Sequence, residues 1–259
     1  MHPSSIIHPE AKLDPSVEIG PFCYIEKGTI LGAGCKLGSH VIIREGVRLE
    51  PDVSVDSFSI LGGLPQDLEF QKDIKSFVSI GTGTCIREGV TIHRSKYKGE
   101  TTYVGKKCYL MAHSHVGHDC VVKDKVILAN NVLLAGHVEV ADNVTIGGNT
   151  SIHQFLRIGE GAMVGGFSGF TKDVPPFCLV AERNRLAGLN LVGLKRFGVT
   201  SQTLQELKRA YTLVFAKIGT SLMDKAQTLL ASGQYKSPEV QTFLAFFQPS
   251  KKGILTPDL

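Results

Sequence analysis

An aliphatic residue recurs every six positions through the first two-thirds of the chain. From Ile7 the series runs without a gap to Leu61. It resumes one residue out of register at Ile80 and continues, with one further break, to Val164. A second small or β-branched residue follows four positions after nearly every member of the series. Each hexad therefore predicts one short strand with two inward side chains, followed by a corner.

Three such hexads close one triangular coil, and successive coils stack at about 4.8 Å, the spacing of neighbouring strands. The repeat therefore predicts a mainly β fold, a parallel β-helix that occupies residues 1–187. Glycine follows many of the aliphatic positions, as at Gly20 and Gly147, and we interpret it as a corner residue that needs relaxed backbone limits. Two polar segments, at about 62–78 and 94–103, break the period and should protrude as loops.

A second domain of α-helices is predicted over residues 188–259. Apolar residues at three- and four-residue spacing indicate an amphipathic helix from Thr200 to Lys217. Thr220 or Ser221 can cap a further helix, and Ser237 followed by proline marks the start of another. We expect this helical tail to cover the open end of the β-helix or to contact a neighbouring subunit.

Composition and charge narrow the choice of partners. The chain has 259 residues and 42% hydrophobic content, which is ample for a core. Its net charge is only +4, and we expect no nucleic-acid partner. Charge is concentrated between Arg183 and Arg209, where six Lys or Arg residues face the single acid Glu206. Such a stretch attracts phosphates or an acidic protein.

Targeting and cysteine signals are weak. The N-terminus carries no basic start followed by an apolar run, and no stretch approaches the roughly 20 apolar residues of a membrane span. We therefore expect a cytoplasmic protein without a membrane span. The six cysteines include no Cys-x-x-Cys pair, and four of them fall on the small inward position of a hexad. Core packing explains them better than a zinc ribbon or disulfides do.

The candidate chemistry lies in a column of histidines. Six of the nine histidines fall between His93 and His153. With three hexads to each coil, His118, Gly136 and Gln154 form a vertical line on one corner, with His137 and His153 beside it. Because corner residues lie between inward aliphatic positions, these side chains should point away from the coil interior.

This arrangement favours acyl transfer. A neutral histidine such as His118 can take a proton near pH 7 from a hydroxyl or amine nucleophile. One coil above, Gly136 can present a bare backbone N–H to the oxyanion that develops on an acyl carbonyl. Asp119, next to His118, can orient the imidazole.

Two other interpretations of the histidines remain open. A solvated surface corner needs no function at all. Zinc binding, as in the β-helical carbonic anhydrases, needs ligands that converge from facing elements, and His113, His115 and His118 on one chain do not converge by themselves. We expect no metal and no cofactor.

The sequence resembles the acyl-carrier-protein–UDP-N-acetylglucosamine O-acyltransferases of lipid A biosynthesis over nearly its full length, helical tail included. The resemblance implies a left-handed β-helix and a homotrimer with active sites in the grooves between subunits. It rests on the strings Gln66-Asp67-Leu68, His115-Val116-Gly117-His118-Asp119-Cys120, Leu134-Ala135-Gly136-His137-Val138, Ile152-His153-Gln154-Phe155, Asp173-Val174-Pro175-Pro176 and Gly193-Leu194-Lys195-Arg196.

The family further implies a reaction and its residues. The donor would be a 3-hydroxyacyl chain on acyl carrier protein, an acidic protein, and the acceptor a UDP-sugar acylated at its 3-position. His118 would be the general base and Gly136 the oxyanion donor, while Gly166 would set acyl-chain length. The implied substrate contacts are Asp67, His115, His137, His153, Gln154, Asn190 and Arg196.

The sequence departs from the family pattern at three positions. Glu69 stands where the family often has Lys, Val192 replaces a frequent acid, and Phe197 replaces a second Arg. These changes raise the alternative of N-acylation of a 3-amino UDP-sugar. The sister N-acyltransferase of the pathway carries an extra N-terminal domain, for which hexads that start at Ile7 leave no room. A non-catalytic β-helical scaffold that binds nucleotide sugars is the remaining alternative.

Overall fold

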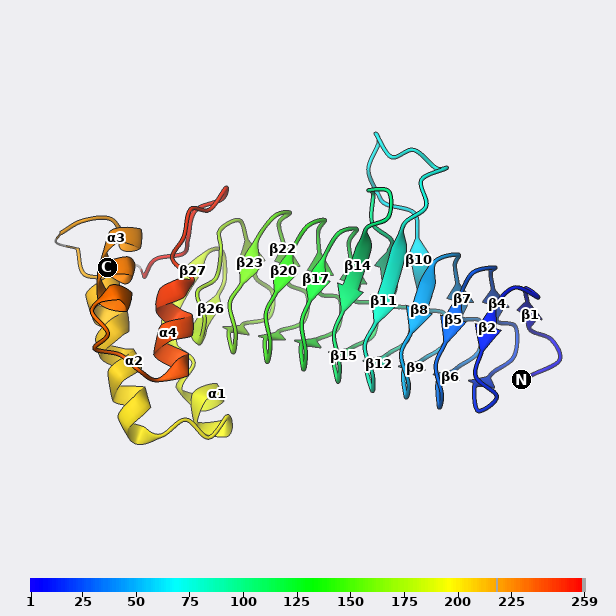
Figure 1. Ribbon diagram of the computed structural model, residues 1–259, viewed down its shortest axis with the longest axis horizontal. Coiled ribbons are helices and arrows are strands. Elements are labelled where there is room, and N and C mark those ends of the chain that lie inside the picture. The colour runs from blue at the N-terminus through cyan, green and yellow to red at the C-terminus, as the bar shows by residue number, and fades with distance from the viewer. Residues whose placement is uncertain (218, 258–259) are drawn as a thin grey trace.

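The first two-thirds of the chain form a triangular prism of three β-sheets, seen from the side in Figure 1. The structure, a computed structural model, describes residues 1–217 and 219–257. The chain passes from one sheet to the next at each corner, so that every third strand of the prism belongs to the same sheet. All pairings within the prism are parallel up to the last strand pair, which confirms the predicted parallel β-helix.

The strands are short, and most contain two residues. Sheet A comprises β1 (Ile6–Ile7), β4 (Tyr24–Ile25), β7 (Ile42–Ile43), β10 (Ile60–Gly63), β13 (Thr91–His93), β16 (His115–Val116), β19 (Leu133–Leu134), β22 (Ser151–Ile152) and β25 (Gly169–Phe170). Sheet B comprises β2 (Lys12–Leu13), β5 (Ile30–Leu31), β8 (Val47–Leu49), β11 (Phe77–Ile80), β14 (Thr101–Val104), β17 (Val121–Val122), β20 (Glu139–Val140) and β23 (Arg157–Ile158). Sheet C comprises β3 (Glu18–Ile19), β6 (Lys36–Leu37), β9 (Ser54–Val55), β12 (Cys85–Ile86), β15 (Tyr109–Leu110), β18 (Ile127–Leu128), β21 (Thr145–Ile146), β24 (Met163–Val164), β26 (Cys178–Ala181) and β27 (Arg185–Leu189).

The register of the strands follows the six-residue period. In an uninterrupted coil, partners are separated by three hexads, as Ile7 and Ile25 are. Leu61 instead pairs with Ile92, because a loop is inserted into that coil. The insertion is not a whole number of hexads, which explains why the aliphatic series resumes one residue out of register after Leu61.

Two loops leave the prism side by side (Figure 1). They comprise residues 64–76 and 94–100, and are shorter than the segments expected at about 62–78 and 94–103. The difference arises because flanking residues lengthen β10, β11 and β14 to four residues each. We call them the first loop (64–76) and the second loop (94–100).

The two inward rows of each coil fill the interior of the prism. Every aliphatic residue of the series from Ile19 to Val164 is at most 5% exposed. The four cysteines of the small row are equally buried, and the Cys120 thiol donates to the carbonyl of Ala135 at 3.1 Å. Each buried aliphatic side chain contributes about 1.5–3 kcal/mol, so the stack is stabilised coil by coil.

The glycines that follow the aliphatic residues have a different role from the one expected. Except for Gly62, which begins the first interruption, they do not adopt positive φ. Instead, an added Cβ on Gly147 would lie only 2.5 Å from the amide nitrogen of Gly166 in the next coil. Their missing side chain therefore permits close approach of successive corners. The left-handed backbone falls two positions later, at corner residues that include Asp119 (φ 61°) and His137 (φ 62°).

Helices gather at the end of the prism opposite the N-terminus (Figure 1). They are α1 (Leu191–Arg196), α2 (Ser201–Val214), α3 (Leu222–Ala231) and α4 (Pro238–Ala245). Thr200 and Ser221 cap α2 and α3 through their side chains, as their residue types predict. The helix expected from Thr200 to Lys217 ends at Val214, because Phe215 leaves helical geometry (φ −87°, ψ 4°). The short α1 was not predicted.

The helical tail is joined to the prism. Residues beyond α4 return to it, where Ile254 pairs with Asp173 and Pro257 with Leu186. Packing of Phe215, Phe243 and Phe247 rings holds the helices together. No described helix is long and apolar enough to cross a membrane.

Gly147→Ala is expected to lower the free energy of unfolding by about 1–3 kcal/mol, because overpacked atoms must shift. The new methyl carbon would meet the Gly166 amide nitrogen at 2.5 Å. Gly169→Ala is the matched control: no heavy atom lies within 4 Å of the carbon that it adds, and we expect a change below about 0.5 kcal/mol. Urea unfolding at equal protein concentration measures both variants, and equal losses would contradict the close-approach role.

Candidate active site

A groove of about 1190 Å³ lies over the C-terminal half of sheet A. One rim is the corner that leads from sheet A to sheet B, where His118, Gly136 and Gln154 line the groove. Phe167, on the corner that leads from sheet C to sheet A, lines the opposite rim and is 84% exposed. The groove therefore runs across the strands of one prism face and opens to solvent.

The coil register places His118, Gly136 and Gln154 in line, as the sequence predicts. Val116 pairs with Leu134 and Leu134 with Ile152, so the residues two positions later also stack. A Cβ on Gly136 would lie 2.6 Å from the His118 ring. Only glycine therefore lets the imidazole lie flat against the corner above it.

His118 and Asp119 form a hydrogen-bonded dyad at this corner. His118 Nδ1 lies 2.7 Å from Asp119 Oδ2, and the two side chains are only 12% and 9% exposed. When the Nδ1–H donates to the carboxylate, Nε2 is the unprotonated ring nitrogen and can act as a base. The structure thus brings together the proposed base and the residue expected to orient it.

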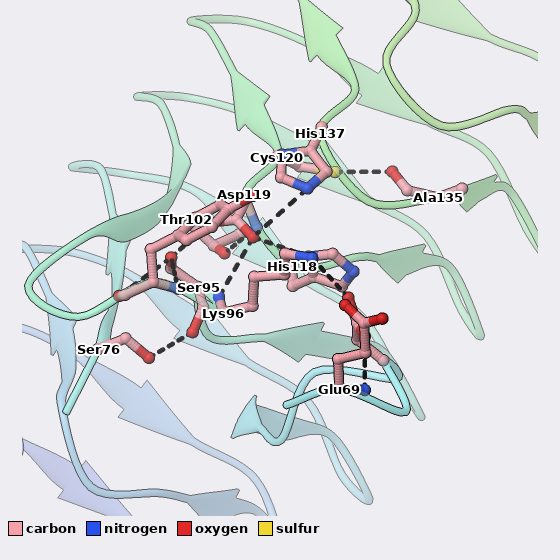
Figure 2. A network of polar contacts seen from close by, with 12 residues as sticks. Glu69, Ser76, Ser95, Lys96, Thr102, His118, Asp119, Cys120, Ala135 and His137 are labelled. Carbon is pink, nitrogen blue, oxygen red and sulfur yellow. Dashed lines mark hydrogen bonds and ion pairs between the residues drawn. The ribbon is translucent and has the colours of Figure 1, made fainter. Parts of the chain in front are cut away.

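The Asp119 carboxylate is held in its ionised form. Burial opposes ionisation, but hydrogen bonds from His118, the Ser95 hydroxyl and the Lys96 amide outweigh it and lower the pKa of Asp119. Figure 2 shows these contacts converging on the carboxylate from the second loop and from the coil. An anionic Asp119 stabilises the imidazolium that forms when His118 accepts a proton.

His137 extends the dyad by one coil. Its Nε2 lies 3.9 Å from Asp119 Oδ2, and its ring stacks on Phe155 at 4.4 Å with an interplanar angle of 10°. Burial lowers the pKa of His137, against the opposing charge of Asp119. A neutral His137 beside the dyad can hydrogen-bond a polar substrate group.

In the described part of the chain, one group of three side chains could offer ligands to a metal ion. His118, Asp119 and His137 present atoms within 4.8 Å of one another. Tetrahedral zinc with ligand bonds of 2.0–2.2 Å would separate its ligand atoms by about 3.3 Å. The 2.7 Å contact of His118 with Asp119 is instead that of a proton shared between ring and carboxylate.

Two further histidines line the groove below the dyad. His115 Nδ1 lies 2.7 Å from the Thr91 hydroxyl, and the His115 ring meets His93 edge-on at 4.7 Å. Burial lowers the pKa of His93 to about 4, and the nearby His115 and His118 contribute smaller effects in the same direction. Sequence reasoning assigned His93 no role, although it follows the inward Ile92, which pairs with Val116.

Asp67 reaches the site from the first loop. Its Oδ2 accepts a hydrogen bond from the Lys96 ammonium at 2.7 Å, which lowers the pKa of the Asp67 carboxyl. Glu69, the charge reversal noted in the sequence, is exposed and donates its amide to Asp67 Oδ1 at 2.9 Å. The ion pair of Asp67 with Lys96 joins the two loops, and Lys96 lies beside His118 and Asp119 in Figure 2.

The structure does not bring every expected residue into the groove of one chain. His153 and Gln154 line it and are exposed, whereas Gly166 lies on the opposite corner against Gly148. Asn190 caps α1 by accepting from the Gly193 amide at 2.9 Å. Arg196, in the last turn of α1, is exposed away from the groove lining.

Comparison with known proteins gives consistent matches over the whole chain. A family model described as Udp N-acetylglucosamine O-acyltransferase, Domain 2, matches residues 173–255, and one for bacterial transferase hexapeptide repeats matches residues 16–51. The acyl-[acyl-carrier-protein]–UDP-N-acetylglucosamine O-acyltransferase of Campylobacter lari is 41% identical, over 96% of both chains.

Solved structures resemble the prism and the helical tail together. LpxA from Acinetobacter baumannii is 34% identical with a TM-score of 0.92, over 98% of both chains. The UDP-N-acetylglucosamine acyltransferase of Francisella novicida is 31% identical with a TM-score of 0.92, over 99% of this chain and 94% of that one.

The lowered pKa of His93 predicts a pH-dependent stability. The unfolded chain binds a proton at this residue below about pH 6.5, but the folded chain does so only near pH 4. The free energy of unfolding is therefore expected to decrease as the pH falls from about 6.5 to about 4. His93→Gln should flatten the decline by at most about 1.4 kcal/mol per pH unit.

Urea unfolding between pH 7 and pH 4 measures this effect. His113→Gln, which removes an exposed histidine from the same groove, is the matched control and should leave the slope as in the unsubstituted protein. A slope that is unaltered in His93→Gln would contradict the assigned pKa.

Proposed function

The chain belongs to the family of acyl-[acyl-carrier-protein]–UDP-N-acetylglucosamine O-acyltransferases, and we propose on that premise that it transfers a 3-hydroxyacyl group from acyl carrier protein to the 3-hydroxyl of UDP-N-acetylglucosamine. This is the first step of lipid A biosynthesis, and we place it in the cytoplasm. The observation that carries the proposal is the stack of His118 on Gly136 at the rim of the groove.

The dyad supplies the base. His118 Nε2 takes the proton of the sugar 3-hydroxyl while the oxygen attacks the carbonyl carbon of the acyl thioester. The oxyanion that develops on the carbonyl accepts the backbone N–H of Gly136, one coil above the base. When the C–S bond breaks, the imidazolium returns the proton to the thiolate of the carrier, and the sugar ester remains. Asp119 stabilises the imidazolium in between.

The remaining polar residues of the groove would hold the acceptor. His115, His153 and Gln154 line the groove. Asp67 of the first loop and His137 of the next coil lie outside that lining but close to the dyad. A carboxylate accepts hydrogen bonds from sugar hydroxyls, whereas imidazole and carboxamide N–H groups can also donate to the oxygens of a diphosphate.

Gly166 lies on the corner next to Phe167, which lines the far rim of the groove. This is the end at which the acyl chain would terminate. With no side chain at this position, Gly166 leaves room for a long acyl chain, and its neighbour Phe167 bounds that room.

We propose a homotrimer in which each groove is completed by a partner subunit. Asn190 and Arg196 lie outside the groove of their own chain, so as substrate contacts they would act as Asn190 of the partner subunit and Arg196 of the partner subunit. Leu68, at the tip of the first loop, is fully exposed, which suits burial against a neighbouring chain. Light scattering is expected to report three times the chain mass of 28.0 kDa. A monomer of full activity would contradict the shared site.

The basic stretch would receive the acyl carrier protein. Arg183 lines the groove, while Lys208 and Arg209 are exposed on α2. An acidic carrier that docks along this surface would bring its acyl group to the C-terminal end of the groove. Opposite charges on the two proteins would also speed their encounter.

The direct test is mass spectrometry of the product made from 3-hydroxyacyl carrier protein. UDP-N-acetylglucosamine and its 3-amino analogue are offered in parallel, and we expect an ester of the former. A reversed preference would support the N-acylation alternative that Glu69, Val192 and Phe197 raise. Product from neither sugar would favour the non-catalytic scaffold.

In the same assay His118→Ala is expected to lower kcat by about 10²–10⁴, the usual contribution of a general base. UDP-sugar binding should stay largely intact, because the other polar residues of the groove remain. His8→Ala is the matched control: it removes a histidine from the same edge of the prism at its far end, since Ile7 belongs to sheet A as Val116 does. Unchanged turnover of His118→Ala would overturn the base assignment.

A further inference from the structure

Asp119 is supported by the second loop and its following strand. At a regular corner, residues are held by the backbone of the adjacent coil, as the His137 amide donates to the His118 carbonyl at 3.0 Å. Asp119 instead donates its amide to the Thr102 hydroxyl at 2.8 Å. Its carboxylate accepts from the Ser95 hydroxyl and from the Lys96 amide, the latter at 3.2 Å. These supports come from the segment that interrupts the repeat.

We propose that Ser95 and Thr102 are positioning residues that hold Asp119 in the orientation in which it accepts the His118 Nδ1 proton. The inference rests on the proposed function, and through Ser95 it gives the second loop a role in catalysis. We call Ser95, Lys96 and Thr102 the dyad brace.

The brace fixes each degree of freedom of Asp119. The Thr102 hydroxyl holds the backbone of Asp119, whose φ is 61°. Ser95 binds Oδ1, while the Lys96 amide and His118 share Oδ2. With both oxygens occupied, the carboxylate cannot rotate about its terminal bond, and Oδ2 stays aimed at the imidazole.

Because the dyad brace is buried, water cannot replace the hydrogen bonds that it makes to Asp119. Ser95 and Thr102 are both 0% exposed, and the Ser76 hydroxyl of the first loop donates to the Ser95 carbonyl. The charged groups that face Asp119 are His118 on its own corner, His137 above it and the Lys96 ammonium, which Asp67 neutralises. None of these can replace the Ser95 hydroxyl at Oδ1.

The brace also connects the dyad to the acceptor site. Ser95 and Lys96 are adjacent residues: the first binds Asp119, and the ammonium of the second binds Asp67 at 2.7 Å. A shift of the second loop would therefore move the proposed sugar contact and the proposed base together. This coupling keeps the sugar hydroxyl and His118 in one fixed relation.

Ser95→Ala tests the brace in the acyl-transfer assay. We expect kcat to fall about 10- to 100-fold, the effect of losing a hydrogen bond to a charged acceptor, with KM for the UDP-sugar changed less than about twofold. The acidic limb of the pH profile should move to higher pH. The Ser95 hydrogen bond is one of the contacts that lower the pKa of Asp119, and a protonated carboxyl cannot accept from His118.

Ser76→Ala is the matched control. It removes a buried hydroxyl that joins the same two loops but does not touch Asp119, so kcat and the pH profile should stay within about twofold of the unsubstituted protein. Thr102→Val, a change of similar volume, removes the acceptor of the Asp119 amide and should lower kcat as Ser95→Ala does. Circular dichroism establishes that each variant folds. Equal kcat values in Ser95→Ala and Ser76→Ala would overturn the inference.

A crystal structure of Ser95→Ala decides the inference without reference to acyl transfer. The expected result is a rotated Asp119 carboxylate, with its separation from His118 Nδ1 beyond the 2.7 Å of the intact dyad. An unchanged separation would refute the brace even if the protein is an active acyltransferase. A lengthened separation in a protein without acyltransferase activity would instead refute the proposed function and leave the brace established.

Discussion

The alignment of the site depends on one constraint, the hydrogen-bonded stacking of successive coils. Because partner strands are separated by three hexads in the uninterrupted coils, a residue on one corner must lie directly beneath the residue one coil later. The buried aliphatic rows fix this register, since a slip by one position would turn them to solvent. His118, Gly136 and Gln154 are thereby aligned without any contact dedicated to that purpose.

The regular coils and the two loops that interrupt them contribute different parts of the site. Regular coils place a base beneath a bare amide, which is a matter of spacing alone. The two loops add groups that the spacing of the coils cannot supply. The Ser95 hydroxyl donates a hydrogen bond to Asp119, and the Asp67 carboxylate, held by Lys96, lies beside the dyad. Lys96 contacts both Asp67 and Asp119, so the two loops that interrupt the repeat meet at the dyad and complete the site.

The fold and the alignment of the dyad could be predicted from sequence because both follow from a period. The Ser95–Asp119 bond could not, since it joins a loop of no pattern to a corner across the insertion. His93 escaped notice because only the pairing of Ile92 with Val116 brings it beneath the groove. The corner glycines were misread because sequence shows which residue lacks a side chain, but not the 2.5 Å approach that forbids one. The roles proposed for Asn190 and Arg196 involve a neighbouring chain, which no internal repeat describes.

The left-handed corners have a consequence for how the site can evolve. Asp119 and His137 occupy backbone positions with φ near +60°, which β-branched residues reach only under strain. Elsewhere the same position holds Asn131, Asn143 and Asn149, which tolerate it well, and also Phe and Lys residues such as Phe155 and Lys107, but no β-branched residue among those described. The backbone at these two positions therefore disfavours Val, Ile and Thr before any selection for chemistry. Asparagine has the same shape as aspartate and accepts this backbone conformation. Asp119→Asn is therefore the substitution that the fold tolerates most easily, and it removes the charge that stabilises the imidazolium.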